Sequence, residues 1–280
     1  MLKLNKPHMR ESVYEYVPEW IKNPEKDMYV MVGDDIDSVA TAGLLREYLG
    51  WEINWFYDFN KVYSHDPSIR KKQRVGVDMA LEMNEKTIDN HVTLLSDKDK
   101  VNPNSVNLNN MFRISQRNYT DKYAMSTLLT AWSLLGIPLP STDEGKKILL
   151  AIDSSYMGHY NKDFNKTHNE WLRVLGFEEL IEFLDNETNE IELNRDIKKR
   201  YNIKEKVWIN EKGQLMTNLD LEGIGRYLEV DLQLPLKEFT LAHELDRENK
   251  KIKLDKNYKK KDKVYSFAVT YKNTISYTIL

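Results

Sequence analysis

The chain has 280 residues and no cysteine, and its 41 Lys and Arg residues against 44 Asp and Glu residues give a formal net charge of −3. Without cysteine there can be no disulfide, thiolate nucleophile, cysteine-bound zinc or iron–sulfur cluster. Any metal site must use carboxylates, imidazoles and amides, and this donor set favours Mg²⁺ or Mn²⁺.

The apolar segments of the chain are short. The longest, such as Ile148 to Ile152, fall far below the roughly 20 residues that a membrane-spanning helix needs. The first eight residues lack the apolar core of a signal peptide. We therefore expect no membrane insertion and a cytoplasmic location.

The first half of the chain alternates short apolar runs with helical patterns. Strands are expected over 27–33, 51–57, 74–78 and 86–89, helices over 38–49 and 123–135, and a further strand-like run over 146–153. Strands that alternate with helices indicate an α/β fold with a mostly parallel sheet flanked by helices. In such sheets ligands bind beyond the carboxyl ends of the strands.

The second half has a different pattern. Residues 171–184 predict an amphipathic helix, and the runs 264–271 and 274–280 predict a β-hairpin whose two-residue turn is Lys272-Asn273. The polar stretch 159–169 separates the two patterns. We therefore expect a first domain over 1–160 and a smaller α+β domain over 165–280.

A basic stretch precedes the predicted hairpin. Residues 247–263 carry nine Lys and Arg residues. They form either a solvated loop or hairpin between two strands or a local patch for nucleic acid.

Aspartates gather at the ends of the strand-like segments of the first half. They are Asp34, Asp35 and Asp37, then Asp78, Asp89 and Asp153. One aspartate in such a place is usually a helix cap or a turn former. A sheet would bring several of them together, and their mutual repulsion then needs a counter-ion. The pattern predicts a divalent metal cluster at that edge.

The order of these segments resembles that of the DHH phosphoesterase superfamily, over about residues 27 to 158. The superfamily has an Asp-x-Asp turn, a lone aspartate, an Asp-His-His signature and a later aspartate. This chain has Asp35-Ile-Asp37, Asp78, then Asp89-Asn90-His91 and finally Asp153, with an Asn-Pro pair at 102–103 shortly after the signature.

The segment from Gly33 to Leu45 is most similar to the first motif of RecJ-type single-strand nucleases. Ser38 stands where that family has glycine, and one residue fewer separates Gly33 from the Asp-x-Asp pair. Met31 stands where the manganese pyrophosphatases of the superfamily have a metal-binding histidine, which argues against that branch.

The resemblance implies two Mn²⁺ or Mg²⁺ ions and assigns a role to each acidic residue. Asp35 would bind the first ion, Asp37 the second, Asp78 would bridge both, and Asp153 would complete the second site. Asp89 would support the cluster, and His91 would contact the scissile phosphate or a metal, which makes these two the expected catalytic residues. Taken singly, Asp78 is equally explained as a turn residue, Asp153 as a helix cap and His91 as a partly buried structural histidine.

The signature departs from the superfamily at Asn90, which replaces a histidine that usually binds metal. An amide oxygen is a weaker ligand than an imidazole nitrogen, although it can hold Mg²⁺ or Mn²⁺. Near the signature, Asn102, Arg113 and Arg117 are expected to bind substrate. The two arginines would do so because phosphoryl chemistry needs positive charge around the phosphate. The alternative is that the two arginines lie on an exposed helix or loop face.

The sequence therefore predicts a metal-dependent phosphoesterase that hydrolyses phosphodiester bonds of single-stranded nucleic acid, oligonucleotides or nucleotides. One alternative is a catalytically degenerate module of the same superfamily that binds nucleic acid or a repair or replication partner. Another is a small-molecule phosphatase that acts on nucleoside phosphates. No feature of the sequence predicts an oligomeric state.

Overall fold

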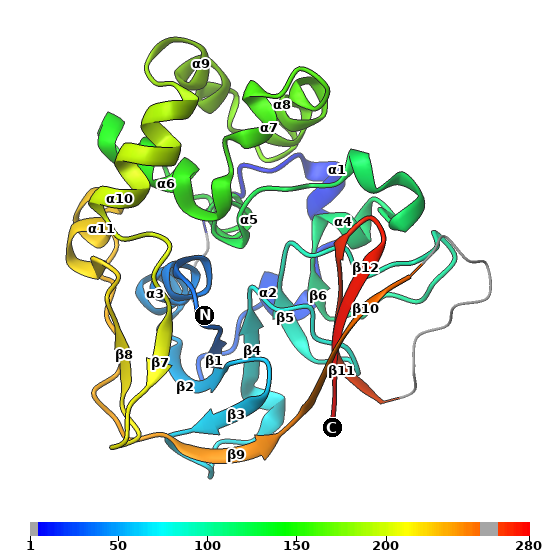
Figure 1. Ribbon diagram of the computed structural model, residues 1–280, viewed down its shortest axis with the longest axis vertical. Coiled ribbons are helices and arrows are strands. Elements are labelled where there is room, and N and C mark those ends of the chain that lie inside the picture. The colour runs from blue at the N-terminus through cyan, green and yellow to red at the C-terminus, as the bar shows by residue number, and fades with distance from the viewer. Residues whose placement is uncertain (1–4, 253–262) are drawn as a thin grey trace.

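A computed structural model describes residues 5–252 and 263–280 of the chain (Figure 1). Its strands are β1 (Tyr29–Val32), β2 (Glu52–Tyr57), β3 (Lys61–Ser64), β4 (Arg74–Val77), β5 (Lys86–Ile88), β6 (Ser105–Val106), β7 (Val207–Ile209), β8 (Leu215–Thr217), β9 (Thr240–Glu244), β10 (Asp246–Lys251), β11 (Val264–Tyr271) and β12 (Thr274–Ile279).

The α-helices are α1 (Glu11–Tyr14), α2 (Glu19–Lys22), α3 (Ile36–Leu49), α4 (Leu108–Met111), α5 (Thr127–Leu134), α6 (Asp143–Ala151), α7 (Met157–Tyr160), α8 (Asn165–Val174), α9 (Glu178–Asn186), α10 (Lys198–Arg200) and α11 (Leu221–Leu228). Short 3₁₀ turns cover Lys71–Gln73, Gln116–Asp121 and Ile152–Ser154, and a π-helical segment covers Glu192–Ile197. No helix within the described ranges is both long and apolar enough to cross a membrane.

A seven-stranded sheet organises the molecule, with the strand order β6-β5-β4-β1-β2-β3-β9. The five strands from β6 to β2 are parallel, and β3 and β9 extend the sheet in antiparallel fashion. The fold is therefore α/β with a mostly parallel sheet flanked by helices, as the sequence predicts. Because β1, β4 and β5 are parallel neighbours, their carboxyl ends meet at one edge.

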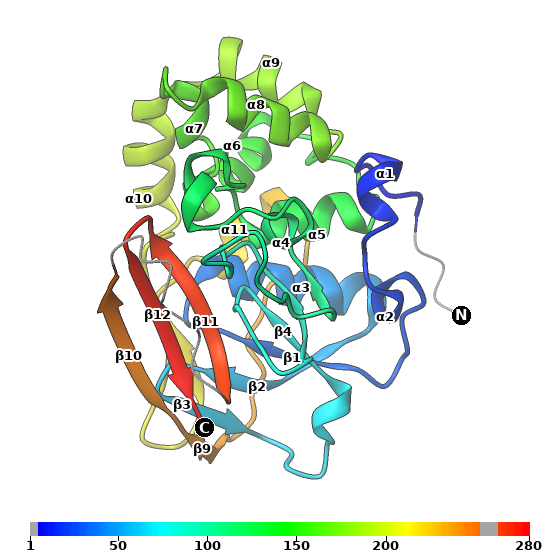
Figure 2. The ribbon, with the colours of Figure 1, turned by 90° about the vertical axis from the view of Figure 1, so that its right-hand side faces the viewer.

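Alternation along β1 directs its side chains to two apolar clusters. Val30 and Val32 lie in the larger cluster with Leu44 of α3, whereas Met31 lies in a smaller cluster with Tyr265 of β11. Helix α3 thus covers one face of the sheet, and the sheet formed by β10, β12 and β11 covers part of the other (Figure 2). The aromatic side chains of β2, Trp55, Phe56 and Tyr57, are buried in the core of the sheet.

Three predicted elements differ from the structure. The run 146–153 is not a strand, since it belongs to α6 and the 3₁₀ turn that follows it. A short buried apolar run fits a helix as well as a strand, and Thr142 decides for a helix by accepting a hydrogen bond from the Gly145 amide as N-cap. Helix α5 is shorter than predicted because it begins after its N-cap, Ser126.

The predicted helix 171–184 is also interrupted. Gly176 ends α8 with a left-handed φ of 75°, and α9 begins at Glu178. A side chain at this glycine would lie 2.3 Å from the His8 carbonyl oxygen, so both the conformation and the packing require glycine.

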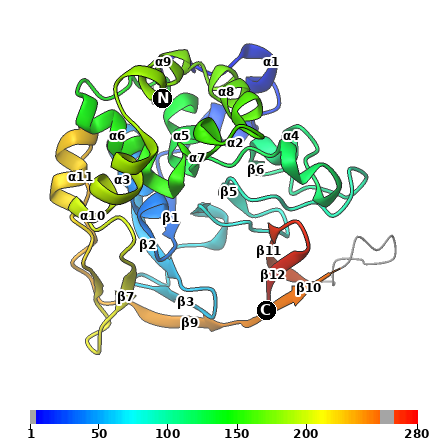
Figure 3. The same cartoon turned by 45° about the horizontal axis from the view of Figure 1, so that its top comes forward.

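The second half of the chain contributes to the large sheet as well as to smaller units. Strand β9 pairs with β3 at the sheet edge, and α11 packs on α6. The strands β7 and β8 form a separate antiparallel pair. In Figure 3 the helices α5–α9 gather at the top, and the three-stranded sheet lies at the lower right.

The C-terminal hairpin is confirmed. Strands β11 and β12 pair in antiparallel fashion across the two-residue turn Lys272-Asn273. Part of the basic stretch forms β10, which pairs with β12 and has exposed Arg247 and Lys251 side chains. Residues 253–262 of that stretch lie outside the described residues.

Candidate metal centre

The turn after β1 places Asp35 at the start of α3. Its carboxylate accepts a hydrogen bond from the Ser38 amide at 3.2 Å and so caps the helix. The Ser38 hydroxyl accepts a hydrogen bond from the Gly33 amide at 2.6 Å and donates one to the Val77 carbonyl at 3.0 Å. Through these two hydrogen bonds Ser38 links the end of β1 to the end of β4.

Asp37, in the first turn of α3, is buried with 2% of its surface exposed. Its two carboxylate oxygens accept hydrogen bonds from the Thr127 amide at 2.7 Å and the Leu128 amide at 2.8 Å. These are the first amides of α5, where the helix dipole favours negative charge. One aspartate thus fixes α3 and α5 against each other.

Asp78 follows the last residue of β4 in a left-handed conformation with φ of 56°. Asp and Asn tolerate this region better than most residues. The Asp78 carboxylate accepts a hydrogen bond from the Thr127 hydroxyl at 2.9 Å, and its amide donates to the Ile88 carbonyl at the end of β5. Thr127 therefore contacts both Asp37 and Asp78.

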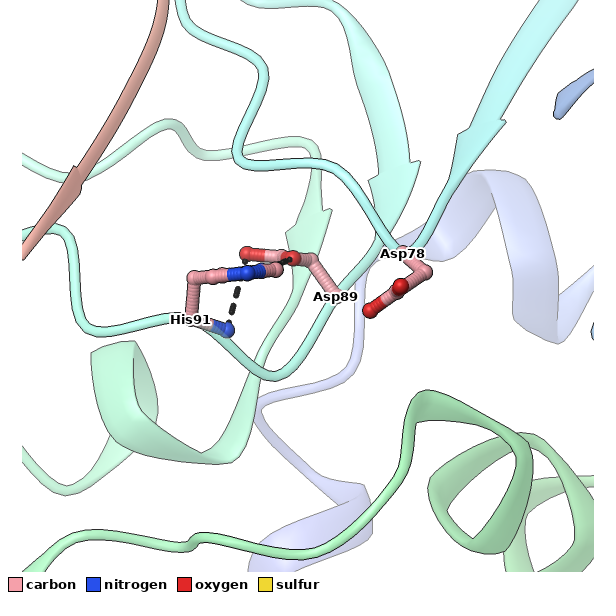
Figure 4. A group of neighbouring side chains, drawn as sticks. All are labelled: Asp78, Asp89 and His91. Carbon is pink, nitrogen blue, oxygen red and sulfur yellow. Dashed lines mark hydrogen bonds and ion pairs between the residues drawn. The ribbon is translucent and has the colours of Figure 1, made fainter. Parts of the chain in front are cut away.

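Asp89 and His91 form a pair after β5 (Figure 4). His91 Nδ1 lies 2.7 Å from one Asp89 oxygen, and the other oxygen accepts hydrogen bonds from the His91 amide and from the Asn107 side chain at 2.9 Å. Asp89 is buried, whereas the His91 side chain is 35% exposed. Ligand atoms of Asp78, Asp89 and His91 all lie within 4.8 Å of one another.

Asp153 reaches the same place from the end of α6. It and Ser154 have left-handed φ angles of 48° and 56° in the turn after the helix. The Asn90 amide nitrogen donates to Asp153 at 3.1 Å and to the Met125 carbonyl at 2.8 Å. The group of Asn90 that faces Asp153 is therefore a donor, whereas the sequence predicted its oxygen as a metal ligand.

The pKa shifts reflect a crowding of negative charge at these segment ends. Burial, followed by the charges of Asp78, Asp153 and Asp35, raises the pKa of Asp37 well above its ordinary value. Burial and then Asp35 likewise raise the pKa of Asp78. Asp153 is open to solvent, yet the protein around its carboxylate removes enough water to raise its pKa too. The structure brings these aspartates into one electrostatic unit.

His91 is the positive member of this unit. Burial alone would lower its pKa, but the charge of Asp89 and the hydrogen bond to it, with further attraction from Asp78 and Asp153, raise the pKa to about 10. The ring is therefore protonated at neutral pH in the metal-free protein.

Lysines from the second half of the chain lie beside the aspartates. Lys206 Nζ is 3.0 Å from Asp34 Oδ1 and 3.5 Å from Asp35 Oδ2, and Lys198 Nζ donates to the Ser154 hydroxyl at 2.6 Å. Burial lowers the pKa of Lys206, but Asp35 and Asp34 raise it overall. A cavity of about 240 Å³ has both kinds of charge in its lining, namely Asp35, Asp37, Asp153 and Glu205 with Lys198, Lys204 and Lys206.

The three predicted substrate-binding residues lie in other surroundings. The Asn102 side chain is buried, and its nitrogen donates to the carbonyls of Leu81 and Glu85 at 2.8 and 2.7 Å. The Arg113 guanidinium donates to the carbonyls of Asp97 and Asp99. Arg117 is exposed. Asn102 and Arg113 thus hold loop backbone, and substrate contact by any of the three stays a prediction.

Lys198 and Lys206 were missed by the sequence analysis. They lie in a charged stretch that has no motif, and more than forty residues separate them from the last aspartate of the cluster. The packing of the π-helical segment on α6 brings Lys198 there. The approach of residues 204–207 to the turn after β1, where the Val207 amide donates to the Asp34 carbonyl at 2.8 Å, brings Lys206 there. The charge of Lys122 also acts on Asp153, so its ammonium lies near that carboxylate.

The donor set fits a divalent cation of the hard type. It consists of carboxylate oxygens with one imidazole, which are the ligands that Mg²⁺ and Mn²⁺ accept. Burial, together with repulsion from neighbouring aspartates, raises the pKa values of Asp37, Asp78 and Asp153, and a bound cation would relieve that repulsion.

No family model, curated protein or solved structure matches this chain. Support for any function therefore comes from the chain's own residues and their placement.

Proposed function

We propose that this protein is a DHH-type, metal-dependent phosphoesterase that hydrolyses phosphodiester bonds of single-stranded nucleic acid, oligonucleotides or nucleotides with Mn²⁺ or Mg²⁺. One observation carries the proposal. Asp35 and Asp37 at the start of α3, Asp78 after β4 and Asp153 after α6 come from three separate segments. Burial, and in addition the charges of neighbouring aspartates, raise the pKa values of Asp37, Asp78 and Asp153. Such a concentration of carboxylates is unfavourable without a cation, and it occurs at the strand ends where α/β sheets bind ligands.

The four aspartates would hold two ions. Such ions would supply a water molecule of lowered pKa and positive charge for the attacking and leaving oxygens of an in-line displacement. This chemistry needs no cysteine and no covalent intermediate, which agrees with the composition.

The chain's own residues would bind and orient the phosphate. The hydrogen bond between Asp89 and His91 Nδ1 fixes the orientation of the ring. Nε2 is then the ring nitrogen left to bind a phosphate oxygen or a metal. A protonated His91 donates to an anion, and Lys198 and Lys206 add positive charge on the other side of the aspartates.

A second candidate is a catalytically degenerate module that binds single-stranded nucleic acid. Asn90 favours it, because its amide nitrogen rather than its oxygen faces Asp153. In this alternative the site takes up fewer than two ions, while Lys198, Lys204 and Lys206 still attract phosphates.

The test compares wild type with Asp78→Asn on single-stranded DNA, short RNA, dinucleotides and nucleoside phosphates in Mn²⁺. Asparagine tolerates the left-handed conformation of Asp78, so the variant should fold. Asp163→Asn, at an exposed position, is the matched control. We expect hydrolysis by wild type and by the control, and a loss of about a thousandfold or more in Asp78→Asn.

Equal rates in wild type and Asp78→Asn, or hydrolysis of none of these substrates, would contradict the proposal. Calorimetry then decides for the degenerate module. The degenerate module predicts uptake of fewer than two Mn²⁺ ions, together with binding to single strands that weakens as the salt concentration increases.

A further inference from the structure

A second cavity, of about 370 Å³, adjoins the aspartate cluster and has a different character. Asp153 and Ser154 line both this cavity and the smaller charged one. Its other walls come from the 119–125 loop, α7 and α8, and they include Met125, Met157, Phe164 and Trp171. A ligand whose phosphate lies on the aspartates thus has an apolar recess directly beside it.

The apolar side chains of this recess are open to solvent to an unusual degree. Met157 is 54% exposed and Phe164 is 40% exposed, and the adjacent Phe112 is 45% exposed. Contiguous apolar surface on a protein commonly marks a place where something binds. Its volume falls in the range of roughly 300–1,000 Å³ that is usual for small-molecule sites.

The floor and rim of the recess are held in place before any ligand arrives. The Trp171 indole donates to the Asp121 carbonyl at 3.0 Å, and its ring meets Phe112 edge-on at 4.8 Å between centroids. Tyr119 donates to the Thr270 carbonyl at 2.8 Å. A preformed aromatic wall lowers the entropy cost of binding a flat ring.

One cation stands at the boundary between the recess and the cluster. Lys122 Nζ lies 4.7 Å from the Tyr119 ring centroid and 3.1 Å from its hydroxyl, and its charge acts on Asp153. An ammonium between an apolar recess and a metal cluster suits a ligand that has an aromatic ring on one side and a phosphate on the other.

We propose that this recess binds one nucleobase of the substrate, next to the phosphate at the aspartate cluster; the inference rests on the proposed function. A base that is paired and stacked in a duplex cannot enter a pocket of this kind. The substrate is therefore a nucleotide or a strand with an unpaired base at the cleavage position, and base contact contributes to its KM.

The test separates base contact from phosphate chemistry. A dinucleotide and the same molecule with one abasic residue are hydrolysed in Mn²⁺ by wild type, Met157→Asp and Phe164→Ala. Both side chains are exposed, so the variants should fold, and melting curves check this. Ile191→Ala, at a 65% exposed position that does not line the recess, is the control.

We expect Met157→Asp to raise the KM of the dinucleotide about tenfold, with kcat little changed, because base contacts of this kind are worth about 1–3 kcal/mol. Phe164→Ala, which adds no charge beside the phosphate, should also raise the KM of the dinucleotide and should leave the KM of the abasic substrate unchanged. Equal effects on both substrates, or none on either, would overturn the inference.

A binding measurement keeps this inference separate from the proposed function. Calorimetry with Asp78→Asn in Mn²⁺ follows the uptake of a trinucleotide, which Met157→Asp in the same background should weaken about tenfold. This result supports the recess even if wild type hydrolyses nothing. No uptake, uptake that Met157→Asp leaves unchanged, or equal uptake of a duplex would contradict it.

Discussion

The two halves of the chain bring opposite charges to the same place, but they hold them differently. The first half supplies the aspartates, and Asp37 is fixed by two backbone amides within the core. The second half supplies Lys206, whose side chain is 55% exposed and is held by ion pairs to Asp34 and Asp35. The acidic side of the site is therefore held by buried hydrogen bonds of the core, whereas the basic side is held by ion pairs at the surface. Changes on the two sides should therefore differ in kind.

The largest effect should come from Asp37→Asn. Its new NH₂ group would face one of two amide donors, from Thr127 and Leu128, and would leave a buried donor without an acceptor. We expect a loss of about 2–3 kcal/mol in the free energy of unfolding, measured by urea titration, together with loss of hydrolysis. Asp163→Asn is again the control. An unchanged unfolding midpoint would mean that Asp37 does not join α3 to α5.

The stability of the metal-free protein should depend on pH, because the carboxylates of the acidic side repel one another. Burial and neighbouring carboxylates raise the pKa of Asp78, so the metal-free folded state keeps a proton that the unfolded chain releases as the pH rises past about 4. His91 acts in the same direction. The stability that its proton contributes is complete below pH 6.5 and is lost as the pH rises to about 10.

We therefore expect the Tm of chelator-treated protein to fall by about 5 °C between pH 6.5 and 10, and Mn²⁺ to raise it at pH 8. Scanning calorimetry measures both. His91→Gln should flatten the pH dependence, and Asp78→Asn should reduce the response to Mn²⁺. A Tm for wild type that saturating Mn²⁺ leaves unchanged would argue against a metal at this site.

The acidic side was largely predictable from the sequence because it follows from regular structure. Three short strand-like segments that lead to aspartate are β1, β4 and β5, and their parallel pairing brings Asp35, Asp78 and Asp89 to one edge. The order of the motifs also grouped Asp153 with these aspartates, and in the structure its charge acts on Asp37 and Asp78, although its segment is a helix. Burial pattern alone does not separate a short apolar strand from a buried helix.

The basic side was not predictable, because no local pattern marks it. Lys198 and Lys206 belong to a charged region, and their position depends on how a π-helical segment and a loop pack on α6 and on the first turn. For Arg113, the position shortly after the Asn-Pro pair suggested phosphate contact, and no pattern in the sequence indicated that its side chain holds the backbone of the loop at Asp97 and Asp99. Such tertiary contacts form between segments that are distant in the sequence, and the spacing of residues within one segment does not reveal them.

Lys206→Gln should change ligand binding and leave the fold intact. Removing an ammonium from Asp35 should tighten Mn²⁺ binding several-fold, because the ion no longer meets a like charge, and should raise the KM for nucleotides about tenfold. Stability should change by less than about 1 kcal/mol, as for other exposed ion pairs. Calorimetry and initial rates measure these effects. Lys212→Gln, exposed on the β7–β8 turn, is the control. Unchanged Mn²⁺ affinity and KM would make Lys206 a surface contact only.

The smallest effect should come from Asn90→Ala. This variant tests whether Asn90 acts on Asp153 through its hydrogen bond or binds a metal itself. The Asn90 hydrogen bond lowers the pKa of Asp153, although burial keeps that pKa above its ordinary value. Without the bond the pKa rises further, so the carboxylate is deprotonated only at higher pH. We expect the acid limb of the rate profile to move to higher pH and the rate at pH 7 to fall about threefold. A uniform fall at every pH would instead indicate that Asn90 binds a metal. No change at any pH would make it a loop residue, held mainly by its bond to Met125.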